Sequence, residues 1–173
     1  RRDENNSNSD LPKYLYLSAS REQREHRKKL SGQEYPKAEY AVHVPAFKPA
    51  DIETLRITEG IPKADIATQL SGIPTIGIPG VNGWNRVFPV LRTLAAKRVL
   101  IALDADHREN PAVADSLAGL ARQCAAEGFA VAVETWHIAQ GKGVDDVLSN
   151  GHQPTLIEGD AVEKYLTETV DPI

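Results

Sequence analysis

The sequence predicts an α/β fold, with a central and mainly parallel sheet of four strands, flanking helices and a short N-terminal extension. Two observations indicate this class. From Leu55 onward, short apolar runs alternate with segments of helical periodicity that end near glycines. Such alternation implies right-handed crossovers, which make the strands parallel and cover both faces of the sheet. The composition of the 173 residues, 41% hydrophobic and 25% charged, suits a single globular core.

The chain divides into four parts. Residues 1–12 are polar, and we expect them to be disordered or to lie at the edge of the folded part of the chain. Residues 13–50 form a basic segment with two short strands. Residues 51–151 contain the regular strand–helix pattern and form the α/β domain. Residues 152–173 are expected to be a helical tail, with a helix over Asp160–Val170.

The elements follow from apolar periodicity and from glycine and proline positions. The expected strands are Lys13–Ser20, Tyr40–Pro45, Leu55–Thr58, Ile73–Ile78, Val99–Leu103 and Phe129–Trp136, the last four forming the sheet. Pro62 suits the first turn of a helix that ends at Gly72, because its missing N–H would be unpaired there. Further helices are expected over about 87–97, 111–127 and 144–150. Cys124 lies on the apolar face of the helix expected over 111–127, which indicates a core residue.

Charge and composition exclude several classes of protein. The net charge of −4 argues against a nonspecific nucleic-acid binder. Residues 1–50 hold 10 Lys/Arg against 7 Asp/Glu, while the remainder holds 10 against 17. This asymmetry fits either a metal site beside a phosphate-binding arm or ordinary surface variation. No window approaches the ~18 apolar residues of a membrane span, and the polar start is unlike a secretory signal. The single cysteine favours a reducing, cytoplasmic setting.

Four loops that contain acidic residues or glycines are predicted to meet at one edge of the sheet. Parallel strands deliver their following loops to the carboxyl edge, where ligands bind in open α/β sheets. Glu59 follows the first strand, the turn at 79–84 the second, and Asp104 and Asp106 the third. The loop at 141–146 follows the fourth. Clustered carboxylates repel one another, so the pattern predicts a divalent cation, and hard oxygen ligands suit Mg²⁺ or Mn²⁺.

Each of these motifs has another interpretation when it is taken alone. Asp-x-Asp after a strand also begins haloacid-dehalogenase-type phosphatases. Those enzymes need Thr or Val where this chain has Arg108, and their Asp strand comes first. Asp145 and Asp146 are equally compatible with negative charge at a helix N-terminus, which the helix dipole favours. Only the order of the motifs along the chain discriminates between these interpretations.

That order resembles the TOPRIM domain of topoisomerases, primases and related nucleases. The details are most similar to the TOPRIM-like domain of phage- and plasmid-borne primase- or helicase-like proteins. The resemblance covers roughly Lys13–Gly151. It rests on Ile57-Thr58-Glu59-Gly60 with Lys63-Ala64-Asp65, Ile78-Pro79-Gly80-Val81 before Trp84, Asp104-x-Asp106, Gly143-Val144-Asp145-Asp146, and the segments Tyr14–Ser20 and Val42–Pro45. It implies a TOPRIM-like Rossmannoid catalytic domain over residues 51–151.

The resemblance also implies roles for individual residues. Glu59 matches the family's glutamate, a general acid/base in strand joining or cleavage. Asp104 and Asp106 match the metal-binding pair. Asp145 or Asp146 matches a later acidic position that helps primases hold a second cation. Because these two acids are adjacent, the sequence leaves open which of them faces the metal.

Several other side chains in or near the carboxyl-edge loops are candidates for binding nucleic acid. The basic candidates for phosphate contacts are Lys63, Arg86, Arg108 and Lys142, and a solvated surface role is the alternative for each. Trp84 is a candidate for stacking on a base, although hydrophobic packing is more usual for tryptophan. We expect His107 to be a partly exposed loop residue. His43 is expected to be structural.

The leading functional hypothesis is Mg²⁺-dependent phosphoryl transfer on nucleic acid, as the TOPRIM core of a DNA primase-like protein of a phage or mobile element. Its expected partners are a single-stranded DNA template and nucleotides, with no membrane. So small a domain suggests zinc-binding or helicase parts elsewhere in a longer protein. The alternatives are a TOPRIM-type metal-dependent nuclease and a noncatalytic module that binds nucleic acid or nucleotide.

Overall fold

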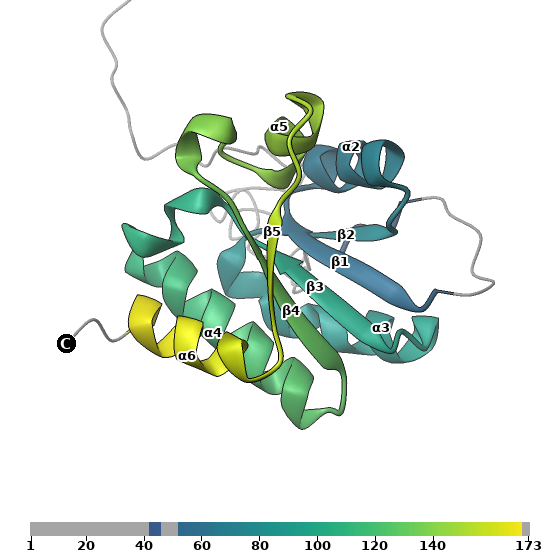
Figure 1. Ribbon diagram of the computed structural model, residues 1–173. Coiled ribbons are helices and arrows are strands. Elements are labelled where there is room, and N and C mark those ends of the chain that lie inside the picture. The colour runs from purple at the N-terminus through teal and green to yellow at the C-terminus, as the bar shows by residue number, and fades with distance from the viewer. Residues whose placement is uncertain (1–41, 46–51, 171–173) are drawn as a thin grey trace, which may run out of the picture. The chain divides into compact units, whose positions relative to one another are not determined.

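A five-stranded sheet forms the centre of the protein in the computed structural model, which describes residues 42–45 and 52–170 (Figure 1). The strand order is β2-β1-β3-β4-β5. The first four strands are parallel to one another, and β5 is antiparallel to β4. Their bounds are Thr54–Glu59 for β1, Thr75–Ile78 for β2, Arg98–Ala102 for β3, Ala130–Thr135 for β4 and Thr155–Glu158 for β5. The predicted α/β class and mainly parallel sheet are therefore confirmed.

The predicted number of four strands is wrong, because β5 lies in the segment that was expected to be a helical tail. This strand is only four residues long and three of them are exposed, so it lacks the apolar alternation that identifies a strand in sequence. Its pairing with β4 runs from Thr135↔Thr155 to Ala132↔Glu158. The helix expected after it is confirmed as α6 (Asp160–Val170).

The remaining helices lie close to their predicted positions. They are α2 (Ile61–Ser71), α3 (Phe88–Leu94), α4 (Pro111–Ala126) and α5 (Val144–Ser149), with short 3₁₀ helices η1 (Val81–Val87), η2 (Ala105–Arg108) and η3 (Ile138–Gln140). Two expectations need correction. The turn at 79–84 continues into η1, which shortens the helix expected over about 87–97. The helical spacing of Ala64, Ala67 and Leu70 predicts one packed face, but Leu70 is 52% exposed while the two alanines are buried.

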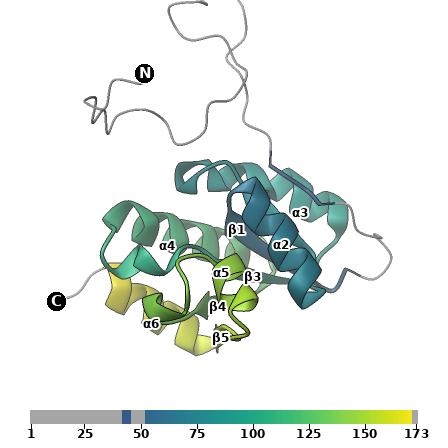
Figure 2. The ribbon, with the colours of Figure 1, turned by 90° about the horizontal axis from the view of Figure 1, so that it is seen from above.

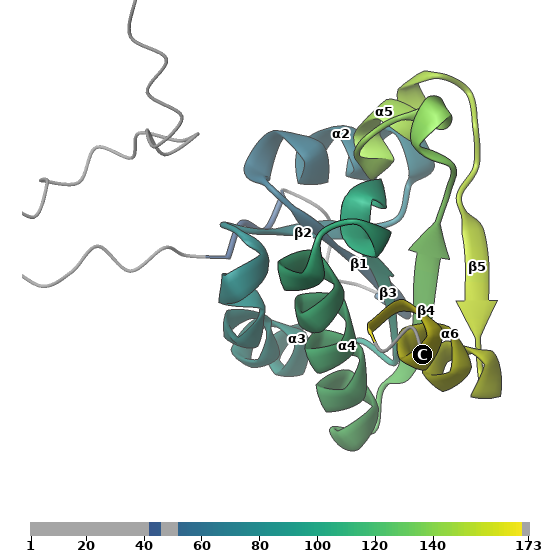
Figure 3. The ribbon, with the colours of Figure 1, turned by 90° about the vertical axis from the view of Figure 1, so that its left-hand side faces the viewer.

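The two faces of the sheet differ in chemistry. Alternate strand residues such as Leu55 and Ile57 belong to the main core, which also takes in residues of α3, α4 and α6. On the opposite face, Ala102 packs with Ala67 of α2 and residues of α5. Figures 2 and 3 show α2 beside α5, and α4 packs against α6. The second face is partly polar and is the one beneath α2.

The structure also bears on the expectations for Cys124 and His43. Cys124 is fully buried, as predicted, and burial followed by the charge of Glu127 raises the pKa of its thiol to about 12. His43 makes a single antiparallel bridge to Gly77, on the part of the expected strand at 40–45 that is described. The expected strand at 13–20 and the terminal segment 1–12 lie outside the described residues. No helix within the described parts of the chain is long and apolar enough to cross a bilayer.

Candidate functional site

The carboxyl edge of the sheet gathers the predicted acidic residues around two lysines. β1 ends at half-buried Glu59, while Asp104 and Asp106 follow β3 at η2. The backbone N–H of Ala105 donates to the carbonyl of Lys142 at 3.0 Å, which ties the loop after β3 to the loop after β4. Loops from distant parts of the sequence therefore meet here, as the strand order requires.

Lys142 brings positive charge to the two aspartates. Its Nζ lies 3.4 Å from Asp106 Oδ2 and 3.8 Å from Asp104 Oδ2. The carboxylates of Asp106, then Asp104 and Glu59, raise the pKa of the Lys142 ammonium, against a small opposing effect of burial. Because Glu59 contributes to this shift, all three acids act electrostatically on the same ammonium. The predicted group of Glu59, Asp104 and Asp106 is therefore one electrostatic cluster in the folded chain.

Lys63 is the second cation of the cluster. It lies in the first turn of α2 and donates a short hydrogen bond to Oδ1 of Asp104, whose side chain is only 9% exposed. Its ammonium also reaches Gly143 closely enough that an added Cβ there would stand 3.0 Å from Nζ. Oδ1 of Asp145 lies against the same point, so Gly143 leaves room for Lys63 and Asp145 to approach. The first turn of α2 thus links the loops after β3 and β4.

Two carboxylate oxygens of the site are buried without a hydrogen-bond donor. Within the described residues, Asp106 Oδ1 and Asp145 Oδ1 have no hydrogen-bond partner, and the same holds for Thr58 Oγ1 on β1. Burial, and then the neighbouring charge of Asp146, raises the pKa of Asp145, although Lys63 lowers it in part. Buried acceptors without donors are costly and uncommon in folded proteins, so each needs an explanation.

The structure separates the two adjacent acids that the sequence could not distinguish. Asp146 is exposed, and its Oδ2 accepts hydrogen bonds from the backbone N–H groups of Lys142 at 3.1 Å and Gly143 at 3.2 Å. These contacts cap the first turn of α5. Asp145 instead turns toward Lys63. Asp145 is therefore the better candidate for a ligand-facing residue, and Asp146 supports the helix.

The fit of a divalent cation can be judged from charge and donor type. Among the described residues, no three His, Cys, Asp or Glu side chains are arranged to hold a metal ion. Lysine ammoniums instead stand among the carboxylates. Among the described residues, one buried oxygen of Asp106 and one of Asp145 still lack donors. Carboxylate oxygens are the donor type that Mg²⁺ and Mn²⁺ prefer, but a cation here would first have to displace the lysine ammoniums from Asp104 and Asp106.

The other candidates for nucleic-acid contacts are distributed differently. Trp84 is half-buried, and its ring meets Phe88 edge-to-face at 6.1 Å and covers Gly119 of α4. It therefore packs against the main core, as the simpler interpretation expected. Arg86 is exposed on η1. Arg108 ends η2, and its side chain lies outside what the structure describes. Lys63 and Lys142 pair with the acidic cluster.

Sequence reasoning missed a buried pair next to the site. His107 is 4% exposed, which corrects the expectation of a partly exposed loop histidine. Its ring contacts Tyr165 of α6, with the ring centres 5.9 Å apart. The two residues are 58 positions apart, so no local pattern could have paired them. Their place behind Asp104 and Asp106 makes them candidates for supporting the site.

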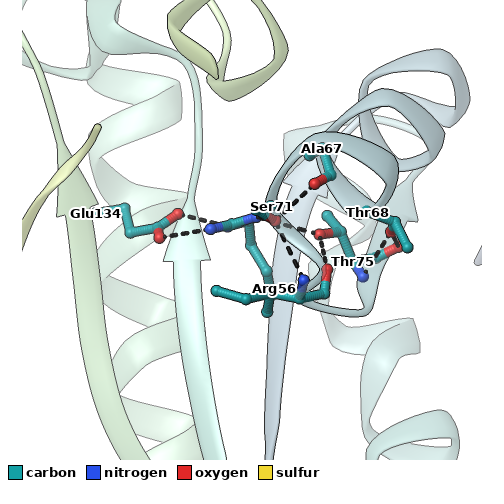
Figure 4. Close-up of polar contacts among 7 residues, drawn as sticks. Arg56, Ala67, Thr68, Ser71, Thr75 and Glu134 are labelled. Atoms are coloured by element: carbon teal, nitrogen blue, oxygen red, sulfur yellow. Dashed lines mark hydrogen bonds and ion pairs between the residues drawn. The ribbon is translucent and has the colours of Figure 1, made fainter. Parts of the chain in front are cut away.

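A second missed feature is a buried ion pair under α2 (Figure 4). Arg56 of β1 and Glu134 of β4 form two parallel hydrogen bonds of 2.6 and 2.9 Å, and both side chains are at most 4% exposed. Arg56 also donates to Ser71 Oγ at 2.7 Å. The only available signal was a charged residue within each otherwise apolar strand.

The comparisons with known proteins identify a family but no function. A family model described as a domain of unknown function (DUF3854) matches residues 50–154. The matched range runs from the start of β1 through α5 and includes every acidic residue of the candidate site, but it ends before β5 and α6. No curated protein and no solved structure matches the chain significantly.

Proposed function

Because the chain belongs to the DUF3854 family, whose description assigns no activity, we propose a function from the site itself. The domain binds Mg²⁺ or Mn²⁺ and catalyses phosphoryl transfer on nucleic acid, as the TOPRIM-like core of a primase-like protein of a phage or mobile element. One observation carries the proposal. Asp104, Asp106 and Asp145 lie with Lys63 and Lys142 at the carboxyl edge, and one buried oxygen each of Asp106 and Asp145 lacks a donor.

The residues that would hold the cation are Asp104, Asp106 and Asp145. Bound there, a divalent cation neutralises charge on a phosphate and aligns the reacting oxygens, which is most of what phosphoryl transfer requires. In the chain by itself, the ammonium of Lys63 serves as the positive partner of Asp104. A cation would compete with Lys63 and Lys142 for these carboxylates. Metal binding is therefore expected to be weak without a phosphate-bearing substrate.

The lysines and Glu59 have complementary roles in this proposal. Lys63 and Lys142 change partners from carboxylate to phosphate when the carboxylates are otherwise neutralised, since both are point charges on flexible stems. Lys142 has a largely exposed side chain, so it can reach a bound strand. Glu59 stands at the end of β1, half-buried and beside the same cluster. A carboxylate in such a position exchanges protons with the attacking or leaving oxygen as a general acid/base.

The partners in this proposal are a single-stranded DNA template and nucleotides, in the cytoplasm. Zinc-binding or helicase parts elsewhere in a longer protein would supply further surface for binding the template.

Metal binding is the first test. Calorimetric titration of Mn²⁺ into the wild type should give weak binding, and Asp104→Asn should reduce the affinity by about tenfold or more, since it removes one direct ligand. Asp115→Asn is the matched control, because Asp115 is an exposed aspartate on α4 outside the cluster. Equal binding by the wild type and Asp104→Asn would contradict the proposed site.

Activity is the second test. Primer synthesis from ribonucleotides on single-stranded DNA would support the primase-like function, and Glu59→Gln should reduce it about 10²-fold or more without lowering the melting temperature. Metal-dependent strand cleavage without nucleotides would instead identify a nuclease. Binding without turnover would identify a noncatalytic module. If Glu59 only braces α2, the variant would melt earlier but keep its turnover per folded molecule.

A further inference from the structure

We propose that Tyr165 of α6 and His107 of η2 are positioning residues, which fix the turn that presents Asp104 and Asp106. This inference rests on the proposed function for the role of the two aspartates. It goes beyond that function because it gives the C-terminal helix, outside the matched family range, a part in the site. Three polar contacts, two of them buried and one partly buried, support the proposal.

The contacts form a chain from β4 to the candidate metal ligands. The Tyr165 hydroxyl lies 3.4 Å from Thr135 Oγ1 at the end of β4 and makes a short hydrogen bond to His107 Nε2. His107 Nδ1 lies 3.0 Å from the carbonyl oxygen of Asp104, and the His107 backbone N–H reaches the same oxygen at 3.3 Å. Both imidazole nitrogens are therefore engaged, one of them directly on the backbone of a candidate ligand.

The chemistry of these groups sets the direction of the hydrogen bonds. A carbonyl oxygen only accepts, so Nδ1 of His107 must be the protonated nitrogen. In a neutral imidazole, Nε2 is then the acceptor and the Tyr165 hydroxyl is the donor. The Tyr165 oxygen keeps lone pairs that accept from the Thr135 hydroxyl. Of the two neutral tautomers, the Nδ1–H form is therefore the one that this geometry selects.

Burial makes the Tyr165 hydroxyl significant. Tyr165 is 7% exposed and lies between Val162 and Leu166, the buried residues that attach α6 to the main core. Phenylalanine would fill the same space without a polar group. A buried tyrosine adds a phenolic hydroxyl, which requires hydrogen-bond partners. Here its partners are the histidine of η2 and the end of β4. The hydroxyl therefore links an anchored helix to the turn that carries Asp104 and Asp106.

The turn is short, and a few backbone hydrogen bonds tie it to its neighbours. η2 is four residues long, and its backbone is tied to the neighbouring loop through Ala105 N–H and Lys142 O. Its far end is closed by the N–H groups of Glu109 and Asn110, which both donate to Asp106 O at 2.9 Å. A short 3₁₀ turn has weaker hydrogen-bond geometry than an α-helix. Loss of the Tyr165 contact should therefore allow η2 to open locally without unfolding the sheet.

The experiment uses the full chain labelled with ¹⁵N, and compares Tyr165→Phe with Thr167→Ala. Phenylalanine keeps the ring and removes only the hydroxyl. Thr167 is an exposed residue of the same helix whose hydroxyl bonds to its own helix at Glu163 O, so its loss should leave η2 unchanged. Three readouts are taken: the tautomer of His107 from its ring ¹⁵N shifts, amide hydrogen exchange, and Mn²⁺ affinity.

In the wild type, His107 should carry its proton on Nδ1. Tyr165→Phe should speed exchange of the Ala105, Glu109 and Asn110 amides about two- to tenfold, the scale of losing one hydrogen bond, while the strand amides stay protected. The Mn²⁺ affinity should fall by a similar factor. Thr167→Ala should change neither quantity.

A second variant tests the direct contact on Asp104. His107→Asn keeps an N–H donor near the place of Nδ1 but loses the contact to Tyr165, so it should retain more Mn²⁺ affinity than His107→Ala. A wild-type imidazole protonated only on Nε2 would overturn the proposal. So would exchange at η2 that is the same in Tyr165→Phe and Thr167→Ala. Absence of Mn²⁺ binding in the wild type would overturn the proposed function, whereas the exchange result decides the role of Tyr165 in either case.

Discussion

Two charged clusters lie at opposite ends of α2 and are satisfied to very different degrees. At its C-terminal end, Ser71 accepts a hydrogen bond from Arg56, which is paired on both carboxylate oxygens of Glu134. At its N-terminal end, Lys63 pairs with Asp104 in a group where acids outnumber lysines. The first cluster is closed within the protein. The second leaves buried oxygens of Asp106 and Asp145 without donors.

This difference separates a structural role from a functional one. A buried ion pair whose hydrogen bonds are all formed has no capacity for a further ligand, and it fixes the strands that it joins. A group with buried acceptors that lack donors is costly in isolation, and a ligand of opposite charge removes that cost. Both clusters contact α2, the closed one from the sheet face beneath the helix and the open one from the carboxyl edge of the sheet. The substitutions and titrations that follow change the closed cluster, the open cluster, or an exposed ion pair that resembles the closed one.

The largest effect is expected from breaking the closed cluster. Arg56→Met should lower the free energy of unfolding by about 3–5 kcal/mol, because it leaves the buried Glu134 carboxylate without its partner. Equilibrium denaturation with urea would measure the loss. The double variant Arg56→Met with Glu134→Leu should recover most of it, since an apolar pair of similar volume avoids the desolvation of both charges.

The double variant is also the control for packing. If it were as unstable as the single variant, the loss would come from the shape of the site and not from an unpaired charge. The open cluster should remain intact in the double variant, so any Mn²⁺ binding seen in the wild type should persist.

The next largest effect should come from filling the open cluster. A ligand that binds only the folded state stabilises it by about 2.7 kcal/mol at a concentration 100 times its dissociation constant. Mg²⁺ or Mn²⁺ should therefore raise the melting temperature of the wild type in proportion to the logarithm of metal concentration. Asp104→Asn should show a much smaller rise over the same concentrations. Parallel rises in both proteins would indicate a nonspecific effect of ionic strength.

The sequence predicted the open cluster better than the closed one, for a physical reason. Acidic residues directly after apolar strands must reach the carboxyl edge once the sheet is parallel, so Glu59, Asp104 and Asp106 could be placed from the sequence. Arg56 and Glu134 pair across β3, and that requires the strand order β1-β3-β4, which strand–helix alternation does not determine. The same limit applies to His107 with Tyr165, and exposed β5 offered no apolar pattern.

A smaller effect is expected from relieving the open cluster without metal. Asp145→Asn should raise the stability of the metal-free protein at neutral pH by about 1 kcal/mol or less. The reason is that burial, followed by the charge of Asp146, raises the pKa of Asp145, so its ionised form is disfavoured in the fold. Urea denaturation in the presence of a chelator would measure the change. The same variant should weaken Mn²⁺ binding, and a loss of stability would contradict this expectation by showing that the nearby charge of Lys63 outweighs the burial of Asp145.

The smallest effect should come from an exposed version of the closed pair. Arg122 makes hydrogen bonds to Glu163 from Nε and Nη2, much as Arg56 does to Glu134, but both side chains are at least 50% exposed. Solvent screens such a pair, so Glu163→Gln should shift the melting temperature by about 2 °C or less. Arg122 lowers the pKa of Glu163 below its ordinary value of 4.5. Its stabilisation is therefore present above that value and is lost as the pH falls through the lowered pKa.

The small shift at pH 7 should accordingly disappear in acid, where wild type and variant should melt together. Asp160→Asn is the matched control, because Asp160 shares the first turn of α6 with Glu163 and separates the helix-dipole contribution from the arginine contact. A loss in Glu163→Gln as large as that in Arg56→Met would show that burial is not what distinguishes the two pairs. The contrast between closed and open clusters would then need another cause. A loss confined to the buried pair would confirm that desolvation sets the cost of leaving a charge without its partner.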